Sequence, residues 1–390
     1  MKVCDLTQFY SPLSGGVKRY VHEKIAYIQR SPGDEHVLVI PGAKTERIEA
    51  PRSRIYSISS PLLSRTSRYR ALLNLRAIEE VLEREKPDLI ESGDPYQVAW
   101  KAIASGAALR IPVVGFYHSH FPEAYLRTTG RFLGRTATEF MMDLARRYVR
   151  QLYNRFEATL VPSARLGNLL AEWGVNNIHA VDLGVNVEVF HPEPDDAVAT
   201  RHSLGISPDS CLLLYVGRLA QEKNTQTLFA AFAQLVRREP ARYHLLVVGD
   251  GLQRVEMLKL QEGVGHLTWR QYSTDSMELA RFYRAAELFV HPGVQETFGL
   301  TALESQACGT PVVGIRGSYM DRIIFGSQEH WAKENSARAL ADAITAAAGG
   351  ELRENGLAAA ATVREHYAWE VVFARLFQIY REVRTNYRDG

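Results

Sequence analysis

The sequence is poor in cysteine and has no long apolar run. Its 390 residues include only three cysteines, Cys4, Cys211 and Cys308, which stand far apart. Such spacing fits neither a metal cluster nor a disulfide framework, so we expect buried structural thiols in a reducing cytoplasm. No apolar run approaches the roughly 20 residues that a membrane-spanning helix needs. The first six residues lack the long apolar core of a signal peptide, which also favours a cytoplasmic protein.

Two further patterns are incomplete. Gly15 and Gly16 precede a predicted helix and can let a phosphate approach the amides at its N-terminus. The full dinucleotide fingerprint with its following acidic residue is missing, which disfavours a nicotinamide-dependent oxidoreductase. His118 and His120 follow a predicted strand, and without a third ligand nearby we predict no metal site. A lone histidine is most often structural, but two in one loop are candidates for contact with a ligand.

Strand and helix patterns alternate in two successive blocks, which predicts parallel sheets with helices on both faces. The fold class is α/β, with two doubly wound, Rossmann-like domains. Two prolines in residues 191–194 interrupt regular structure and divide the chain into domains 1–190 and 191–369. Ligands of such sheets bind beyond the carboxyl ends of the strands, so we expect the domains to face an interdomain cleft. The expected strands are 3–6, 37–40, 89–91, 113–116, 159–161, 212–216, 244–248, 267–269, 288–290 and 312–314.

Glu296 and Glu304 stand eight positions apart after the apolar run 288–290. A Pro-Gly turn and an amphipathic segment follow this run, which predicts a strand, a tight loop and a helix. Glu296 falls in the loop, where a carboxylate can accept hydrogen bonds from polyol hydroxyls and the helix amides can meet an anion. Two isolated glutamates more often only favour a helix N-terminus or stay solvated. The glycines around this pair favour a loop that approaches a ligand closely.

The loop after the predicted strand 212–216 is cationic. It carries Arg218 and Lys223 between a strand and a helix. An arginine can bind a diphosphate through two hydrogen bonds, and a lysine adds a mobile charge. Together they can stabilise the charge of a leaving diphosphate. The alternative is an exposed loop with an ordinary network of arginine, glutamate and lysine, and the two glutamates after a later strand of the same domain argue against it.

Arginines gather in residues 127–155, where only Glu139 and Asp143 oppose them, and apolar residues recur between them at helical spacing. A basic amphipathic helix can lie on an anionic membrane surface. The alternative is a surface helix whose apolar stripe joins the core, and for the stripe itself we favour this interpretation. The charge still indicates an anionic partner, whether a membrane, a lipid phosphate or a nucleotide. The arginines are Arg127, Arg131, Arg135, Arg146, Arg147, Arg150 and Arg155.

Taken together, these motifs resemble the retaining glycosyltransferases of family 4, which have the GT-B fold. The resemblance covers essentially the whole chain, from the loop of Gly15 and Gly16 to the motif of Glu296 and Glu304, and includes residues 184–192. The end of the chain resembles the family's last helix, which crosses back to the N-terminal domain at about residues 370–390. The resemblance implies transfer of a hexose from a nucleotide-diphosphate sugar, GDP-mannose or a UDP-hexose, with retained anomeric configuration and with no cofactor or obligatory metal.

The resemblance implies roles for the cationic and histidine loops. Arg218 and Lys223 would hold the donor diphosphate, to which Gly15 and Gly16 would contribute backbone amides. His118 would contact the sugar near the reacting centre and help to orient it. No nucleophile is assigned, because family members are described through a front-side mechanism in which the leaving phosphate assists deprotonation of the acceptor. The predicted catalytic residues are His118, Arg218, Lys223 and Glu296.

The resemblance also assigns contacts to the sugar, the ribose and the base. Glu296 would bind hydroxyls of the sugar, and Glu304 would bind the ribose. Arg270 and Tyr272 are the predicted contacts of the base, although Gln271 stands where relatives often have glycine. The base and the sugar therefore stay open. The full donor set is Gly15, Gly16, Arg218, Lys223, Arg270, Tyr272, Glu296, Phe298, Gly299, Leu300 and Glu304.

The acceptor is predicted from the first domain. Arg65, Arg68, Arg70 and the basic segment 127–155 lie in the domain where this fold binds acceptors. They favour a lipid-linked or glycolipid acceptor and peripheral attachment to the inner face of the cytoplasmic membrane, with no nucleic-acid partner. Two alternatives stay open, a nucleotide-sugar binding protein without transfer activity and an epimerase of the same fold. A new glycosidic bond in the product distinguishes a transferase from both.

Overall fold

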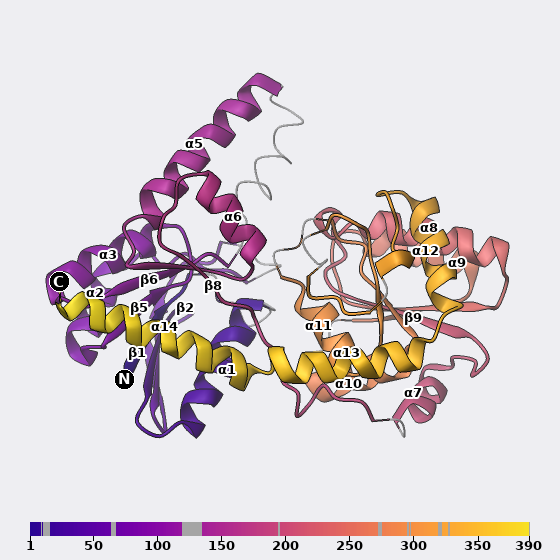
Figure 1. The fold of residues 1–390 in the computed structure, drawn as a ribbon, viewed down its shortest axis with the longest axis horizontal. Helices are drawn as coiled ribbons and strands as arrows, with labels where there is room; N and C mark the ends of the chain where they lie inside the picture. The colour runs from indigo at the N-terminus through magenta and orange to yellow at the C-terminus, as the bar shows by residue number, and fades with distance from the viewer. Residues whose placement is uncertain are drawn as a thin grey trace. The chain divides into compact units, whose positions relative to one another are not determined.

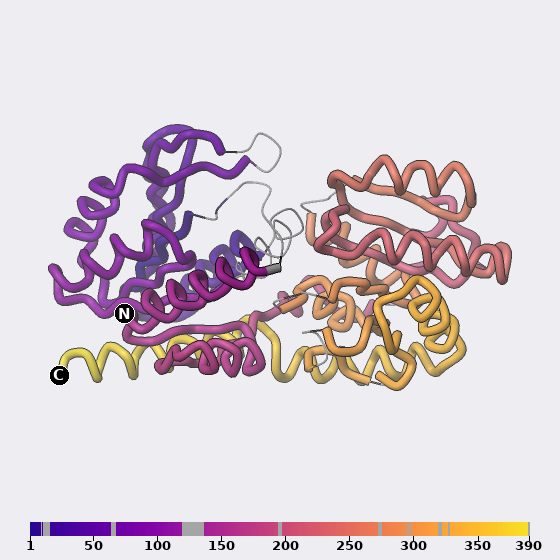
Figure 2. The backbone as a smooth tube through the Cα atoms, turned by 90° about the horizontal axis from the view of Figure 1, so that it is seen from above, coloured from indigo at the N-terminus to yellow at the C-terminus, as the bar shows by residue number. Residues whose placement is uncertain are grey.

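The protein is described from a computed structural model, and the description covers all residues except 9, 11–15, 64–67, 119–134, 194–195, 272–274, 295, 297, 319–321, 327 and 390. It forms two compact units, one of Met1–Leu183 with Trp369–Gly390 and the other of Gly184–Ala368 (Figure 1). Both ends of the chain belong to the first unit (Figure 2). Each unit is built on a sheet of mainly parallel strands, which confirms the predicted α/β class with two Rossmann-like domains.

The first unit has an eight-stranded sheet in the order β3-β4-β2-β1-β5-β6-β7-β8, parallel except for the edge strand β3. The five strands predicted here are present, whereas β3, β4 and β8 were missed. The strands are β1 (Lys2–Leu6), β2 (Glu35–Gly42), β3 (Glu46–Ala50), β4 (Ser53–Ser59), β5 (Leu89–Ser92), β6 (Val113–Phe116), β7 (Ala158–Val161) and β8 (Ile178–Ala180). The helices are α1 (Gly16–Arg30), α2 (Leu75–Glu85), α3 (Gln97–Leu109), α5 (Arg135–Tyr153), α6 (Ala164–Glu172) and α14 (Trp369–Asp389).

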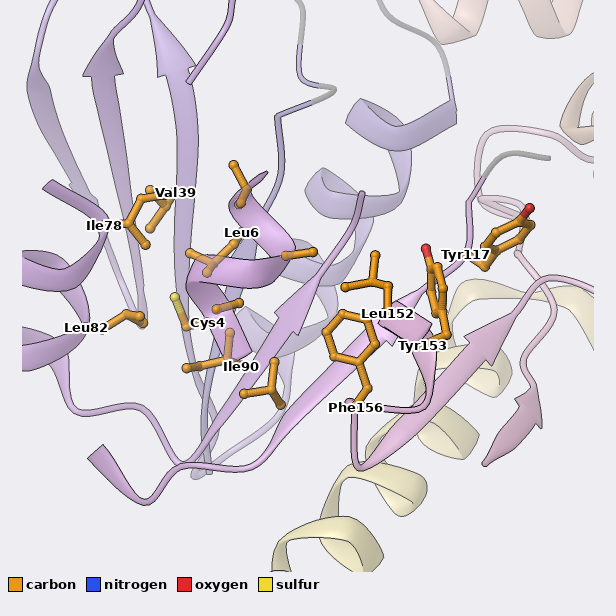
Figure 3. Packing of buried hydrophobic residues seen from close by; sticks show 14 of the residues in the cluster. Cys4, Leu6, Val39, Ile78, Leu82, Ile90, Tyr117, Leu152, Tyr153 and Phe156 are labelled. Atoms are coloured by element: carbon orange, nitrogen blue, oxygen red, sulfur yellow. The ribbon is translucent and has the colours of Figure 1, made fainter. Parts of the chain in front are cut away.

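The two faces of this sheet have different neighbours. Cys4 and Ile90 point into an apolar core that also contains Leu82 of α2 and residues of α3, α5 and α6 (Figure 3). The next residues along the strands, Asp5 and Glu91, face the other way, because side chains alternate along a strand. Helices α1 and α14 contact each other and meet this second face, along which α14 runs in Figure 1. The second face therefore carries charged side chains under two helices.

These charged side chains form a buried network. Lys24 of α1 lies 3.0 Å from Asp5 and 3.1 Å from Glu91, and the Tyr380 hydroxyl of α14 donates to Glu91. Burial raises the pKa of Glu91 to about 7, although Lys24 acts in the opposite direction. Burial alone would also raise the pKa of Asp5, but Lys24 and His36 lower it to about 2. Asp5 is thus an anion at neutral pH, whereas Glu91 titrates near neutrality.

We expect a Glu91→Gln variant to gain stability over the parent as the pH rises. A glutamate of the unfolded chain titrates near 4.5, whereas folded Glu91 keeps its proton up to about pH 7. The parent therefore has its full stability below the unfolded pKa and loses part of it as the pH rises to the folded pKa. The variant has no titrating group at this position. Melting temperatures from about pH 4.5 to 8 measure the effect, and a pH-independent difference would contradict it.

The second unit has a five-stranded parallel sheet in the order β11-β10-β9-β12-β13, and all of its strands were predicted. They are β9 (Cys211–Val216), β10 (Tyr243–Val248), β11 (Leu267–Arg270), β12 (Leu288–Val290) and β13 (Val312–Val313). The helices are α7 (Asp196–Leu204), α8 (Thr225–Arg238), α9 (Arg254–Val264), α10 (Ser276–Ala285), α11 (Leu300–Ala307), α12 (Ala337–Ala348) and α13 (Leu352–Tyr367), with the short 3-10 helices η2 (Gln221–Lys223) and η3 (Gln328–His330).

The division of the chain lies between Leu183 and Gly184 rather than at residue 191. The amide of Val185 donates to the carbonyl of Tyr367 at 2.8 Å, and Val185 forms a parallel bridge with Ala368. These bonds tie the segment before the prolines to the end of α13, so residues 184–190 belong to the second unit. Prolines interrupt secondary structure, but they do not decide to which core a segment belongs.

The three cysteines are free thiols. Cys4 and Cys308 are buried as expected, whereas Cys211, at the start of β9, is only half buried and corrects that expectation. Burial raises the pKa of both Cys211 and Cys308 to about 12. All three are therefore poor nucleophiles at neutral pH, because the pKa of the buried Cys4 is raised as well.

Candidate active site

The cationic loop follows β9 directly. The Tyr215 hydroxyl donates to the carbonyl of Arg218 at 2.9 Å and fixes the start of the loop. The Arg218 side chain is 71% exposed, and its nearest charged partner is Glu222 at 3.0 Å. A surface ion pair of this kind is weak, so an anionic ligand can compete for Arg218. Lys223 ends η2, and α8 begins two residues later at Thr225.

Glycines let the loops after β9 and β10 pack on each other. A Cβ atom on Gly249 would lie 1.9 Å from the carbonyl oxygen of Gly217, and one on Gly251 would lie 2.3 Å from that of Leu219. The amide of Leu219 donates to the carbonyl of Asp250 at 2.9 Å. The Gly-Asp-Gly sequence after β10 therefore supports the neighbouring cationic loop, by a close approach that larger residues would prevent.

The loop after β12 brings a carboxylate to this cationic loop. Nζ of Lys223 lies 2.8 Å from Oε1 and 2.6 Å from Oε2 of Glu296. Nε2 of His291 lies 3.7 Å from the same Oε2. A Cβ atom on Gly293 would lie only 2.9 Å from the His291 ring, so glycine makes room for this arrangement. The side chains of Lys223 and Glu296 keep 26% and 16% of their surface exposed, which leaves the ion pair within reach of a ligand.

Electrostatics fix the charge of Glu296. Burial alone would raise the pKa of its carboxyl, but the Lys223 ammonium and the His291 ring lower it by more, so the pKa lies well below the ordinary value. Glu296 is therefore an anion at neutral pH. That state suits an acceptor of hydrogen bonds from hydroxyl groups and does not suit a general base, whose pKa must lie near the working pH. Glu296 thus forms a direct ion pair, which the alternative of a glutamate that only favours a helix N-terminus did not include.

Helix α11 begins directly after the loop of Glu296. Gly299 precedes it with φ 90°, a conformation that glycine adopts without strain. Phe298 is buried, and the Arg322 guanidinium lies 5.4 Å from the centre of its ring. The first amides of a helix have no acceptor within the helix. The amides that start at Leu300 thus offer donors to an anion or a hydroxyl beside Glu296.

Glu304 is buried inside the same helix. Its residue is 1% exposed, and the Tyr283 hydroxyl of α10 donates to its Oε2 at 3.1 Å. The alternative of a solvated glutamate is therefore wrong for Glu304. The contact between Glu304 and a ribose stays a prediction, and in this structure the carboxylate binds a tyrosine of the neighbouring helix.

Arg270, the predicted base contact that the structure describes, is the last residue of β11. Arg270 is exposed, and its Nη1 donates to the carbonyl of Trp269 at 3.4 Å. Gln271 uses its side-chain amide to bridge to Asp250 at 3.4 Å, and the Trp269 indole donates to the carbonyl of Gly249 at 2.8 Å. Gln271 thus joins two strand ends, and Arg270 is the exposed group next to them. Gly15, His120 and Tyr272 lie outside the described residues.

The remaining predicted residues belong to the first unit. Gly16 is the first residue of α1 and is exposed. The His118 ring stacks on Phe116 with centroids 4.0 Å apart and meets the edge of Tyr20 at 5.1 Å. Burial, reinforced by the charge of Lys24, lowers the pKa of His118 to about 3. His118 is therefore a neutral ring in a fixed aromatic setting, able to exchange hydrogen bonds with a substrate.

Helix α5 contains most of the described part of the basic segment, and Figure 1 shows it extending from the sheet. Its second half joins the core through Val149, Leu152 and Tyr153, as predicted for a surface helix whose apolar stripe joins the core. Its first half instead exposes Phe140 and Leu144 to 71% and 59%. Arg146, Arg147 and Arg150 are also exposed, whereas Arg127 and Arg131 lie outside the described residues. Among the helices that the structure describes, none combines the length and the apolar character needed to cross a membrane.

Three residues of the site escaped prediction as functional residues. His291 flanks Glu296, Asn224 follows Lys223, and Tyr283 holds Glu304. Asn224 had a usable signal, because an asparagine between a loop and a helix often takes the left-handed conformation and bonds with its side chain. Tyr283 had none, because it lies on a different helix from the carboxylate that it binds.

Comparison with known proteins shows a match to a glycosyltransferase family profile in each half of the chain. A family profile described as Glycosyl transferases group 1 matches residues 197–362, and one described as Glycosyltransferase Family 4 matches residues 14–189. Over 347 residues the chain is 29% identical to the GDP-mannose-dependent alpha-(1-6)-phosphatidylinositol dimannoside mannosyltransferase of Mycobacterium tuberculosis, covering 88% of this chain and 87% of the relative. The GDP-mannose-dependent alpha-mannosyltransferase of Corynebacterium glutamicum is 27% identical, with 81% and 72% covered.

Solved structures share the fold over nearly the whole chain. Sucrose-phosphate synthase from Thermosynechococcus elongatus matches with a TM-score of 0.77 at 22% identity, over 98% of both chains. The HepE protein of Anabaena in complex with UDP matches with a TM-score of 0.74 at 15% identity, over 98% of this chain and 100% of that one. With one profile on each half and this fold throughout, the chain belongs to the GT-B glycosyltransferases of family 4, the glycosyl transferases group 1.

Proposed function

We propose that this glycosyltransferase moves a hexose from a nucleotide-diphosphate sugar to a lipid-linked acceptor and retains the anomeric configuration. The observation that carries the proposal is the ion pair between Lys223 and Glu296 at 2.8 and 2.6 Å. A diphosphate needs cations, and a hexose needs acceptors for its hydroxyl hydrogens. The loops after β9 and β12 offer these two kinds of group side by side.

In this proposal the charge of the donor is met by side chains and helix amides. Arg218 and Lys223 bind the diphosphate and stabilise the charge that develops when it leaves. Glu296 accepts hydrogen bonds from hydroxyls of the hexose, and the first amides of α11, from Leu300 onwards, donate to the same ligand. The bond to the sugar breaks through a transition state with oxocarbenium character. Two cations and a helix N-terminus suffice for this step, so we propose no metal and no cofactor.

We assign no nucleophile among the predicted residues. Glu296 is held in an ion pair, Glu304 is bound by Tyr283, and His118 is a neutral ring stacked on Phe116. The leaving phosphate instead takes the proton of the acceptor hydroxyl, while that hydroxyl oxygen bonds to the anomeric carbon on the face from which the phosphate departs. Attack on this face retains the configuration. His118 orients the sugar through a hydrogen bond.

GDP-mannose is the first candidate donor. Two relatives that span most of the chain are named as GDP-mannose-dependent mannosyltransferases. A UDP-hexose is the second candidate, because HepE was solved with UDP and with UDP-glucose. Melting curves with GDP, UDP and ADP identify the base, and transfer of radiolabelled mannose or glucose to lipid extracts identifies the sugar. Binding of the donor with neither hydrolysis nor transfer would favour a binding protein without transfer activity, and absence of nucleotide binding would reject the donor site.

A membrane-presented acceptor is supported by two observations. The relative from Mycobacterium tuberculosis is named for a phosphatidylinositol dimannoside acceptor. In this chain, the first half of α5 exposes Phe140 and Leu144, and its later turns expose arginines. Apolar side chains can enter the boundary between headgroups and acyl chains, while arginines attract anionic lipids. We therefore propose a cytoplasmic protein that binds peripherally to the inner face of the cytoplasmic membrane.

A variant with Phe140→Ser and Leu144→Ser should bind anionic vesicles at least about tenfold more weakly, because it loses the apolar area that α5 can bury in the interface. Flotation with vesicles containing phosphatidylglycerol measures this loss, and vesicles of phosphatidylcholine alone should bind little of either protein. Leu252→Ser is the matched control, because Leu252 is 94% exposed but lies in the second unit. Equal flotation of the parent, the α5 variant and the control would contradict α5 as the membrane contact.

A further inference from the structure

Asn224 is the residue that links the cationic loop to the carboxylate loop. It follows Lys223 directly and lies between η2 and α8 in the left-handed conformation, with φ 57°. Asparagine takes this conformation more readily than most residues. The backbone thus gives one reason for an asparagine at this position, and the side chain gives another.

The side-chain amide of Asn224 makes three hydrogen bonds. Nδ2 donates to the carbonyl oxygen of Pro292 at 2.8 Å and to Oδ1 of Asn335 at 2.7 Å. Oδ1 accepts a hydrogen bond from the Thr227 hydroxyl at 2.8 Å. The orientation of the amide follows from chemistry, because a carbonyl oxygen only accepts and Nδ2 must therefore face Pro292.

The bond to Pro292 acts where the sheet no longer joins the two loops. β9 and β12 pair only through Leu213 with Leu288 and Leu214 with Phe289, and both loops lie beyond these pairs. Pro292 stands four residues before Glu296 in the sequence. The amide of Asn224 thus fixes the separation of the two backbones from which the ammonium and the carboxylate extend.

We propose that Asn224 is a positioning residue for the donor. It sets the distance between the loop that binds the diphosphate and the loop that binds the hexose, without touching either group. This inference rests on the proposed roles of Lys223 and Glu296. In the free protein the ion pair is a second link between the loops. A diphosphate that engages Lys223 weakens this ion pair, and the neutral bond from Asn224 to Pro292 then keeps the loops aligned.

The expected signature is a loss of affinity confined to ligands that span both loops. In Asn224→Gly the left-handed backbone is kept at little cost, while all three side-chain bonds are lost. We expect the affinity for GDP-mannose to fall by about tenfold, because the carboxylate loop is no longer held in register with the diphosphate. The affinity for GDP, which lacks the hexose that Glu296 would bind, should change by less than about twofold. If the base is uracil, UDP-glucose and UDP should show the same difference.

Isothermal titration with both nucleotides and both nucleotide sugars tests the proposal. Arg110→Gly is the matched control, because Arg110 is also a left-handed residue (φ 56°) but caps a helix of the first unit. It should leave all affinities unchanged, and both glycine variants should melt close to the parent. Parallel losses for nucleotide and nucleotide sugar in Asn224→Gly would show a general structural role and overturn the proposal, as would no loss for either. Failure of the parent protein to bind any of these ligands would instead reject the proposed function.

Discussion

Replacing Lys223 with alanine should lower kcat for hexose transfer by about 100-fold to 1000-fold. Such losses are typical when one donor that stabilises developing charge is removed from an active site. Lys223 is suited to this role because its ammonium lies on a loop between a strand and a helix, 26% exposed, and is already oriented by Glu296 at 2.8 and 2.6 Å. The variant also leaves Glu296 without its strongest partner, so the pKa of that carboxyl should rise and its hold on the hexose should weaken.

The variants Glu296→Gln and Lys223→Ala should not have additive effects. Both break the same ion pair, so the double variant should lose less activity than the product of the two single losses. Lys259→Ala provides the control, because Lys259 is an exposed lysine of α9 in the same unit. The test is to measure steady-state transfer rates of the single variants, the double variant and the control, with the donor that the nucleotide-binding experiment identifies. Transfer rates that match the parent in either single variant would show that the ion pair is not the donor site.

The pH dependence adds a second readout to this pair. Because the pKa of Glu296 lies well below its ordinary value, the carboxylate stays charged throughout the neutral range. A fall in the transfer rate between pH 5 and 8 therefore cannot be assigned to protonation of Glu296. It would have to come from the acceptor, from the phosphates or from a group outside this ion pair.

The fold was predictable where the chain is buried on both sides of a sheet. Continuous apolar runs such as residues 37–40 and 212–216 are typical of central parallel strands, and they became β2 and β9. The edge strand β3, Glu46–Ala50, was missed because it is short, charged and largely exposed, and such strands carry no apolar signal. The three-residue strand β8 was missed for a similar reason, since none of its residues is buried.

The site was predictable in its loops but not in its contacts. The positions of Arg218, Lys223 and Glu296 follow from strand ends and from glycines, which a sequence displays. The direct contact of Lys223 with Glu296 depends on where β9 and β12 stop pairing, which a sequence does not display. The burial of Glu304 against Tyr283 likewise depends on the packing of α10 on α11. Contacts between separate elements were therefore the part that only the structure could supply.

The largest expected effect on stability comes from the buried network of the first unit. Lys24→Met should lower the free energy of unfolding of this unit by about 3–5 kcal/mol, as is typical when one partner of a buried ion pair is removed. Lys24 is 0% exposed and lies 3.0 Å from Asp5 and 3.1 Å from Glu91. Methionine fills a similar volume but leaves these carboxylates without their ammonium. Lys101→Met is the control, because Lys101 pairs with Glu79 near the surface, where such pairs are worth at most about 1 kcal/mol.

The loss in Lys24→Met should depend on pH and on Glu91. Below about pH 7 Glu91 holds a proton, so the uncompensated charge is then that of Asp5 alone, which His36 still contacts at 2.9 Å. The variant should therefore lose more stability at about pH 8 than at pH 5.5, and adding Glu91→Gln should restore part of the loss at the higher pH. Hydrogen exchange of the α14 backbone amides during urea unfolding measures the stability of the first unit, because Tyr380 of α14 contacts Lys24. Peptides of the second unit serve as the internal reference. A loss equal to that of Lys101→Met at both pH values would show that the network contributes little to stability, and that apolar packing alone holds α14 on the sheet.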